Sequence, residues 1–371
     1  MEKRRLGKTG LEVSLLGFGG FHQLEIPAKK VEKLLNYFLD HGGNYVETAA
    51  EYGHGEAERK MGPVVGKRRD EIVLASKTHL RDKKGAEESL NQTLTNLQTD
   101  YLDLLFMHHV GDKETLDQIL SPGGAMELAE KARSKGKIKN IGISMHGQPD
   151  ILIEALKTDK FDVVMAVFNY FDRFNFPKLE DELLPLAQKK NAGIVLMKPI
   201  ADGFLWRSAE KAFHYAFSLP VSVVATGMNS MEMMKEDIKY AENYTPMTPA
   251  EKEELFKTAP ELGNYVCRQC DECYQCPEGI DIKEIFKLEG YYDRQMRDGK
   301  PRNPEKFALR DRLRFWFGND ERARELYQKL ETKADQCTEC EKCLDYCPYN
   351  LPIMKKLQIA HYKLGDDDSL F

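Results

Sequence analysis

The stretch IVLASKTHLRDKKGAEESLNQTLTNLQTDYLDLLFMH, residues 72–108, contains two apolar runs separated by one amphipathic segment. The runs IVLAS and LDLLFM are typical of buried strands, and the segment between them carries leucines at helical spacing. Parallel strands need a crossover connection, which is usually a helix. The stretch therefore predicts one strand–helix–strand unit of a parallel sheet.

The same pattern recurs over the first 245 residues. Six further apolar runs, VSLLGF, NYVET, IKNIGIS, VVMAVFN, GIVLMK and SVVAT, raise the number of predicted strands to eight, and amphipathic segments such as AKKVEKLLNYFLDHG and PKLEDELLPLAQKK follow them. Eight units in about 240 residues predict a closed (β/α)8 TIM barrel. A doubly wound sheet is the alternative, but no G-x-G-x-x-G opens the first helix. The opening RRLGKTGLEVS predicts a short hairpin that turns at residues 8–10.

Length and composition set the domain organisation. A chain of 371 residues with 42% hydrophobic and 31% charged residues predicts a large domain, 1–247, and a smaller one, 248–371. The net charge is −6, and basic clusters are short and flanked by acids, which argues against nucleic-acid binding. No apolar run approaches the ~20 residues of a membrane span, and MEKRR leads into no signal sequence, so we expect a cytoplasmic protein.

All eight cysteines lie in two runs, CRQCDECYQCP at residues 267–277 and CTECEKCLDYCP at residues 337–348. Disulfides do not persist in a reducing compartment, so we interpret these cysteines as metal ligands. The spacing C-x2-C-x2-C-x3-C-P is typical of [4Fe-4S] clusters in two-cluster ferredoxins. Zinc is the alternative metal, although its tetrahedral sites usually use cysteines in separated pairs.

In such ferredoxins the fourth cysteine of each run binds the other cluster. One predicted cluster therefore has the ligands Cys267, Cys270, Cys273 and Cys347, and the other has Cys337, Cys340, Cys343 and Cys276. Helical patterns such as IKEIFKLEGYYDRQM lie between the runs, which predicts a mainly helical ferredoxin-like domain. Two adjacent clusters favour electron transfer over a purely structural role.

Polar residues gather at the carboxyl ends of the predicted strands, which in a barrel form the active face. They are Glu47, Lys77, His108, Ser144, Asn169 and Lys198. A lysine that ends the run IVLAS is costly if it is buried without a partner. Glu47 and Tyr52 can supply a carboxylate and a phenol to it.

The string NYVETAAEYGHGEAERKMG at residues 44–62, followed by IVLASK, LDLLFMHH and IGIS, resembles the aldo-keto reductases over about residues 1–245. With the cysteine runs, the chain resembles the branch that carries a carboxy-terminal dicluster ferredoxin domain. The resemblance implies a catalytic set of Tyr52, Lys77, His108 and Glu47, in which Glu47 replaces the family's Asp. Because a glutamate reaches farther than an aspartate, we expect either that Lys77 shifts or that the pair changes its role.

The resemblance also implies the cofactor site, at Ser144, Asn169, Lys198 and Gly227. Methionines stand at other positions where the family contacts a nicotinamide cofactor: Met145, Met165, Met197, Met228 and Met233. The loop after the eighth strand offers Glu232, Glu236 and Asp237 to a 2′-phosphate, with Lys235 as the nearby cation. The usual grip on NADP(H) is therefore weakened, and NAD(H), a flavin or no nucleotide stay open.

Three functions follow from these motifs. The first is an iron–sulfur oxidoreductase that interconverts a small-molecule carbonyl and an alcohol, with Tyr52 as acid/base and an external electron carrier such as a ferredoxin or flavoprotein. Iron–sulfur clusters move single electrons, so this function needs a two-electron intermediary. The second is an isomerase or lyase that uses Tyr52, Lys77 and His108, with structural or regulatory clusters. The third is a non-enzymatic electron-transfer or scaffold subunit.

Overall fold

The computed structural model describes residues 1–146, 149–263, 266–270, 272–273, 276–293 and 320–365. These residues divide into two compact units. The first unit contains Met1–Asn169 and Lys178–Met247, and the second contains Tyr170–Pro177 and the described residues from Thr248 onward. Within the part of the chain that is described, no helix is both long and apolar enough to cross a membrane.

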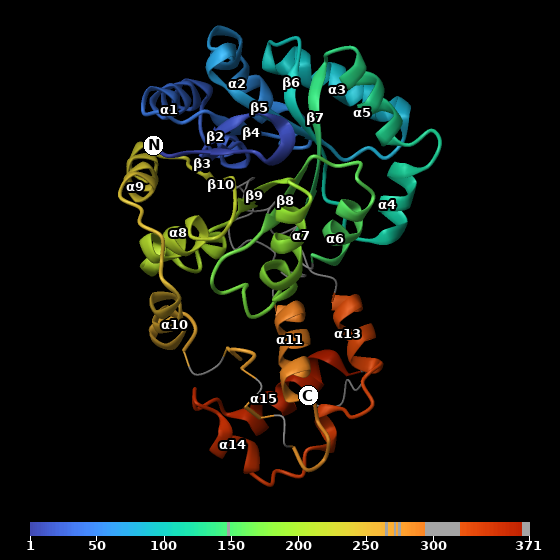
Figure 1. The fold of residues 1–371 in the computed structure, drawn as a ribbon, viewed down its shortest axis with the longest axis vertical. Coiled ribbons are helices and arrows are strands. Elements are labelled where there is room, and N and C mark those ends of the chain that lie inside the picture. Colours follow the sequence, from blue (N-terminus) through green and yellow to red (C-terminus); the bar gives the residue numbers. More distant parts are fainter. Residues whose placement is uncertain (147–148, 264–265, 271, 274–275, 294–319, 366–371) are drawn as a thin grey trace. The chain divides into compact units, whose positions relative to one another are not determined.

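The first unit is a closed barrel of eight parallel strands in the order β10-β3-β4-β5-β6-β7-β8-β9 (Figure 1). This confirms the predicted (β/α)8 fold, and each strand coincides with a predicted apolar run. The strands are β3 (Leu16–Gly19), β4 (Tyr45–Glu47), β5 (Val73–Thr78), β6 (Leu102–Met107), β7 (Ile138–Met145), β8 (Val163–Val167), β9 (Gly193–Met197) and β10 (Val223–Gly227).

Helices follow the strands and cover the outside of the barrel, as Figure 1 shows. They are α1 (Ala28–Asp40), α2 (Glu56–Lys67), α3 (Lys83–Leu97), α4 (Lys113–Leu120), α5 (Ala125–Ser134), α6 (Asp150–Lys157), α7 (Leu184–Lys189), α8 (Ala209–Phe217) and α9 (Met231–Glu242). Short turns η2 (Phe21–Glu25) and η4 (Leu179–Leu183) precede α1 and α7. Asp82 and Ser230 cap α3 and α9 by accepting backbone N–H bonds at their first turns.

The interior of the barrel is filled by inward-facing side chains, including Tyr45, Leu104, Phe106, Val163 and Val195. Every second residue of a strand faces inward, which places these side chains in layers. The packing of the barrel requires a glycine at position 142 on β7, because a Cβ there would lie 2.4 Å from the Phe106 ring. A hairpin of β1 (Lys3–Arg5) and β2 (Glu12–Ser14) precedes the barrel, and its turn contains the short helix η1 (Gly7–Thr9). The predicted hairpin is therefore confirmed.

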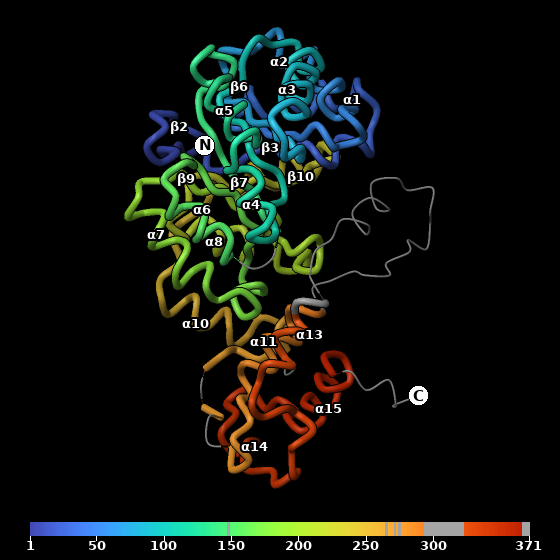
Figure 2. The backbone as a smooth tube through the Cα atoms, turned by 90° about the vertical axis from the view of Figure 1, so that its right-hand side faces the viewer, coloured from blue at the N-terminus to red at the C-terminus, as the bar shows by residue number. Residues whose placement is uncertain are grey.

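The second unit is mainly helical. Its helices are α10 (Pro249–Thr258), α11 (Ile282–Asp293), α13 (Asp320–Gln328), α14 (Lys342–Tyr346) and α15 (Ile353–Leu364), with a short turn η7 (Ala334–Gln336). Helices α11, α13 and α15 pack together in the orange and red part of the chain (Figure 2). The predicted segment 282–296 extends past the described residues. The predicted helix over residues 250–262 ends earlier, at Thr258, because Pro260 disfavours a helical Ala259.

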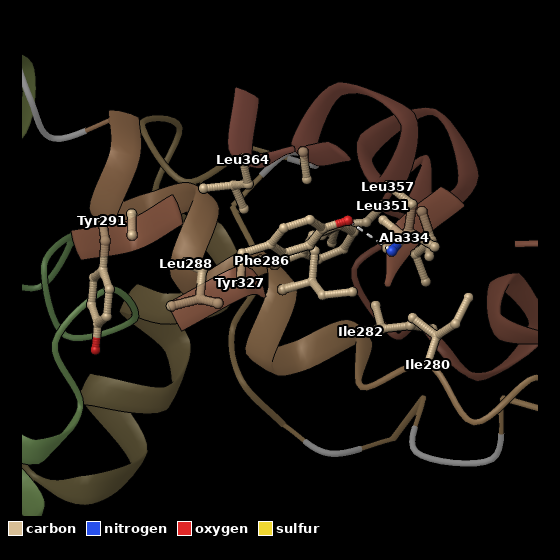
Figure 3. Close-up of a cluster of buried hydrophobic side chains, with 14 of the residues drawn as sticks. Ile280, Ile282, Phe286, Leu288, Tyr291, Tyr327, Ala334, Leu351, Leu357 and Leu364 are labelled. Carbon is tan, nitrogen blue, oxygen red and sulfur yellow. Dashed lines mark hydrogen bonds between the residues drawn. The ribbon is translucent and has the colours of Figure 1, made fainter. Parts of the chain in front are cut away.

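A separate apolar core holds the second unit together (Figure 3). Ile285, Phe286 and Leu288 of α11 meet Leu357 and Leu364 of α15. Tyr327 of α13 lies buried among them, and its hydroxyl accepts a hydrogen bond from the Ala334 backbone N–H at 2.9 Å. Six of the eight cysteines pack against this core. Cysteines of both runs therefore pack against one helical core.

Candidate active site

Lys77 lies at the centre of the site on β5, and its side chain is buried, with 2% exposed. Its ammonium donates hydrogen bonds to Glu47 Oε2, to the Thr48 carbonyl oxygen at 2.9 Å and to the Tyr52 hydroxyl at 3.2 Å. Glu47 ends the neighbouring strand β4, and Tyr52 lies on the loop that follows it. Three acceptors thus compensate the cost of burying the ammonium.

The glutamate at position 47 contacts Lys77. We expected that its extra length would displace Lys77 or change the role of the pair. Instead, Glu47 contacts Lys77 while Lys77 still reaches Tyr52. Both side chains are buried, so the carboxylate keeps the lysine charged.

Burial controls the protonation of Tyr52 and Lys77. It raises the pKa of Tyr52 to about 12, because the Lys77 charge offsets only part of the cost of burying a phenolate. Burial alone favours the neutral amine of Lys77, but Glu47 and Tyr52 outweigh it and raise the lysine pKa. At neutral pH the site therefore holds a neutral phenol beside an ammonium.

His108 follows β6 and completes the predicted set. Its ring lies edge-on to the Tyr52 ring, with centroids 5.9 Å apart, and Phe21 packs on Tyr52 at 5.1 Å. The backbone N–H of His108 donates to the Thr78 carbonyl at 2.9 Å. Burial lowers the pKa of His108 to about 4, so its imidazole is neutral at physiological pH. The structure thus brings together all four residues of the predicted catalytic set.

Two of the predicted cofactor residues are fully buried and bonded to the backbone. Ser144 Oγ accepts from the His109 N–H at 3.2 Å and donates to the Met107 carbonyl at 3.4 Å. Asn169 donates to the Lys198 carbonyl at 3.1 Å. These side chains support the loops of the active face.

The other two cofactor positions lie at loop starts. Lys198 follows β9 in a left-handed conformation (φ 62°), and its ammonium lies 3.4 Å from Asp202. Gly227 ends β10 against the His22 ring, where a Cβ would meet His22 Cδ2 at 1.9 Å. Any larger residue at position 227 would therefore displace His22.

The methionines of the cofactor positions differ in their burial. Met145 at the end of β7 and Met165 in the middle of β8 are buried, with 6% and 1% exposed, and Met228 is also buried. Met197 is half-buried and Met233 is exposed. The buried methionines offer no polar group to a carboxamide.

Sequence reasoning missed three polar residues around His108. Glu51 Oε2 lies 3.0 Å from His108 Nδ1, and Glu51 Oε1 lies 3.2 Å from His79 Nδ1. Arg81 donates to the carbonyl oxygens of His108 and His109, at 2.8 and 3.1 Å. One signal could have found two of them, since His79 and Arg81 follow Lys77 at a spacing of two and so share its face in extended chain.

In the second unit, the residues that line one small pocket include four cysteines from both runs, Cys267, Cys270, Cys273 and Cys347. This is the crossed ligand set predicted for one cluster. Cys270 and Cys340 are exposed, and the other six cysteines are half-buried. Among the described residues, no three His, Cys, Asp or Glu side chains converge closely enough to hold a metal ion. The cluster ligands stay a prediction.

Comparison with known proteins agrees with the fold and this site. Residues 15–222 match the model of the aldo/keto reductase family. The uncharacterized oxidoreductase YqkF of Bacillus subtilis is 30% identical over 217 residues, which cover 55% of this chain and 67% of that protein. L-galactose dehydrogenase of Arabidopsis thaliana is 29% identical over 234 residues, 58% of this chain and 70% of that protein. An aldo-keto reductase structure from Bacillus halodurans (holo form) aligns with a TM-score of 0.61 and 27% identity, covering 69% and 96% of the two chains.

A closed (β/α)8 barrel with a half-buried tyrosine and a buried lysine and carboxylate beside a histidine defines an oxidoreductase of the aldo-keto reductase type. The chain belongs to the aldo/keto reductase family. The resemblance stated from the sequence is thus confirmed for the barrel, and the iron–sulfur branch stays a prediction.

Proposed function

We propose that this protein is an iron–sulfur oxidoreductase that interconverts a small-molecule carbonyl and its alcohol. The observation that carries this proposal is the contact of half-buried Tyr52 with buried Lys77, which Glu47 holds in place. A neutral phenol next to a permanent ammonium can give up and recover a proton, which is the proton chemistry of carbonyl reduction.

Each residue of the predicted catalytic set has its own role in this proposal. Tyr52 gives its phenolic proton to the carbonyl oxygen during reduction, and the Lys77 ammonium, 3.2 Å away, stabilises the phenolate that remains. Glu47 keeps Lys77 charged. In the opposite direction the phenolate takes the proton from the alcohol. His108, beside Tyr52, orients the reacting oxygen.

A bound nicotinamide or flavin would supply the two electrons as a hydride. Support for a nicotinamide comes from aldo-keto reductase structures of Klebsiella pneumoniae in complex with NADPH and with NADP and acetate, although at 23% and 22% identity they share the fold alone. The fit in this chain is incomplete, because Met145 and Met165 are buried and apolar. We therefore assign the proton steps to named residues and assign no residue to the hydride donor.

The second unit fits iron–sulfur clusters in its donor chemistry. Four thiols from two distant runs line one pocket, which supports crossed ligation. Burial raises the pKa of the Cys267 thiol to about 12, so an unmetalled Cys267 stays protonated and unreactive. Clusters bound there would pass single electrons to an external carrier such as a ferredoxin or flavoprotein. In this proposal residues 1–247 perform the chemistry and residues 248–371 hold the clusters.

The test is an anaerobic titration of the purified protein with NADH, NADPH and FMN, with binding and cluster absorbance followed together. We expect a nucleotide to bind and the clusters to bleach when substrate reduces it. Tyr52→Phe should keep nucleotide binding and lose roughly 10² to 10⁴ of turnover. Binding of no nucleotide, with clusters still reduced by dithionite, would contradict the proposal.

Crossed ligation has its own test. Cys347→Ser and Cys276→Ser are matched variants, because each removes the fourth cysteine of one run. We expect each variant to lose a different cluster, with two distinguishable residual signals in electron paramagnetic resonance of the reduced protein. With crossed ligation, Cys347→Ser should lose the same cluster as Cys267→Ser. If Cys276→Ser instead loses the same cluster as Cys267→Ser, each run binds its own cluster.

An isomerase or lyase is the second candidate, and one observation favours it. The catalytic set is intact, whereas Met145 and Met165 occupy the positions where the family contacts the nicotinamide. Such an enzyme would move protons with Tyr52, Lys77 and His108 and would need no hydride carrier. Calorimetric binding of NADH or NADPH would exclude this candidate.

A further inference from the structure

Glu58 is a fully buried carboxylate that has no part in the proton steps described above. It lies in the first turn of α2, and its two oxygens are bonded to β5 and α3. Oε1 accepts hydrogen bonds from Ser76 Oγ of β5 and Thr93 Oγ1 of α3, each at 2.9 Å, and Oε2 accepts from Asn96 Nδ2 of α3 at 3.0 Å. One side chain thus joins three elements of the barrel.

The surroundings of Glu58 hold its carboxylate in one place. The first turn of a helix favours a negative charge, because its backbone N–H groups point toward it. A buried carboxylate that loses a donor is costly, so the three neutral donors and Glu58 fix one another. The close approach of α2 to α3 also requires a glycine at position 55, with φ 81°, since a Cβ there would lie 2.5 Å from Asn96 Nδ2.

Glu58 connects the loop of Tyr52 to the strand of Lys77. The Tyr52 carbonyl oxygen accepts from the Ala57 N–H at 3.3 Å, and Ala57 directly precedes Glu58. Glu58 accepts from Ser76, which directly precedes Lys77. The ring of contacts closes at the catalytic pair, where the Lys77 ammonium donates to the Tyr52 hydroxyl at 3.2 Å.

The two faces of β5 separate this link from the reacting atoms. Neighbouring residues of a strand point to opposite faces. Ala75 belongs to the barrel interior, so Lys77 points inward as well, whereas Ser76 points outward to the helices. Glu58 therefore acts on the catalytic pair from outside the barrel and does not touch the substrate.

We propose that Glu58 is a positioning residue that fixes the distance between the Tyr52 hydroxyl and the Lys77 ammonium. It holds the first turn of α2, which follows the loop of Tyr52, against Ser76 of β5. Only the catalytic meaning of this inference rests on the proposed function. The contact of Tyr52 with Lys77 can be measured without a substrate, a nucleotide or a cluster.

The measurement is the pKa of the phenol at position 52. We would place 3,5-difluorotyrosine at this position alone in the full chain and follow its ionisation by ¹⁹F NMR as the pH rises. The pKa of Tyr52 is about 12, and the electron-withdrawing fluorines lower it toward a range in which a folded protein is easier to titrate. The Lys77 ammonium lowers the pKa of Tyr52, so a longer distance between them must raise it.

Ser76→Ala and Thr93→Val are matched variants, because each removes one hydroxyl donor from the same oxygen of Glu58. Only Ser76→Ala breaks the link to β5. We expect it to raise the pKa at position 52 by roughly 0.5 to 1 pH unit, a part of what one hydrogen bond from an ammonium contributes to a phenolate. Thr93→Val should leave this pKa unchanged. Both variants should lower the melting temperature similarly, so lost stability does not explain a difference in pKa.

Two variants of Glu58 itself complete the set. Glu58→Leu removes every acceptor and should raise the pKa at position 52 at least as much as Ser76→Ala does. Glu58→Gln keeps one carbonyl oxygen for the Ser76 hydroxyl, so its pKa at position 52 should stay close to the wild-type value.

Either of two results would overturn the inference. One is a Ser76→Ala protein whose pKa at position 52 does not rise. The other is a Thr93→Val protein in which this pKa rises as much as in Ser76→Ala. If Glu58→Leu fails to fold, the matched pair still decides the question. Since no substrate or nucleotide is added, a negative result here is distinct from a failure of the proposed function.

Discussion

Replacing Lys77 by methionine should be among the most destabilising single changes in the barrel. The substitution keeps the length of the side chain and removes the charge, which leaves the buried carboxylate of Glu47 without its ammonium. Removing one partner of a buried ion pair costs roughly 3 to 5 kcal/mol. In a domain of this size each 1 kcal/mol shifts the melting temperature by about 2 to 4 °C. We therefore expect Lys77→Met to lower the melting temperature by on the order of 10 °C.

The matched control is the double variant Glu47→Gln/Lys77→Met, which has no orphaned charge. It should recover a large part of the lost stability, because the penalty comes from the unpaired carboxylate and not from the lost attraction. Near-UV circular dichroism during heating measures both variants against the wild-type protein. A Lys77→Met protein that melts within about 2 °C of wild type, or a double variant no more stable than the single one, would refute the reasoning.

The pH dependence of this stability has a definite sign. The folded protein raises the pKa of Lys77 above its usual value of 10.5. The contribution of the ammonium is therefore fully present below pH 10.5 and is lost as the pH rises through the folded pKa. The stability difference between wild type and Lys77→Met should be the same at pH 7 and pH 9 and should shrink only above about pH 10.5.

Two further outcomes follow from single contacts. Met145→Asn should tighten NADPH binding by roughly 3- to 10-fold in a fluorescence titration, because it restores one hydrogen-bonding side chain worth ~0.5 to 1.5 kcal/mol, whereas Met145→Leu should change nothing. Lys356 is buried and bonded to Glu289 at 2.5 Å, and its charge acts on Cys267. If the proposed cluster binds at Cys267, Lys356→Met should make its potential more negative by on the order of 60 mV, one tenfold step for a one-electron couple, in a potentiometric titration.

The barrel could be predicted because each strand is buried on both faces and so appears as a continuous apolar run. The gathering of Glu47, Lys77 and His108 on one face of the barrel could be predicted for a related reason, since each stands where such a run ends. Helix ends were less predictable. The helix α10 stops at Thr258, and only the proline two residues later marks that end in the sequence.

The residues that were missed act through partners that periodicity does not show. Glu51 stands among the charged residues of EYGHGEAER, where a carboxylate is usually a solvated surface group. Its contacts follow from the ends of β5 and β6, which bring His79 and His108 to its two oxygens. A contact among three loops depends on the closed barrel, and the sequence of any one loop does not contain it.

The accommodation of Glu47 depends on a neighbouring strand in the same way. Glu47 is the register partner of Gly19 on β3, and a Cβ at Gly19 would lie 3.3 Å from Glu47 Oε1 and 2.7 Å from the Thr226 carbonyl oxygen. The missing side chain of Gly19 therefore leaves room for the longer carboxylate beside Lys77. Since Gly19 and Glu47 are 28 residues apart in sequence, the length of Glu47 taken alone predicts a displaced lysine. The register of β3 and β4 explains why Lys77 keeps its contact with Tyr52.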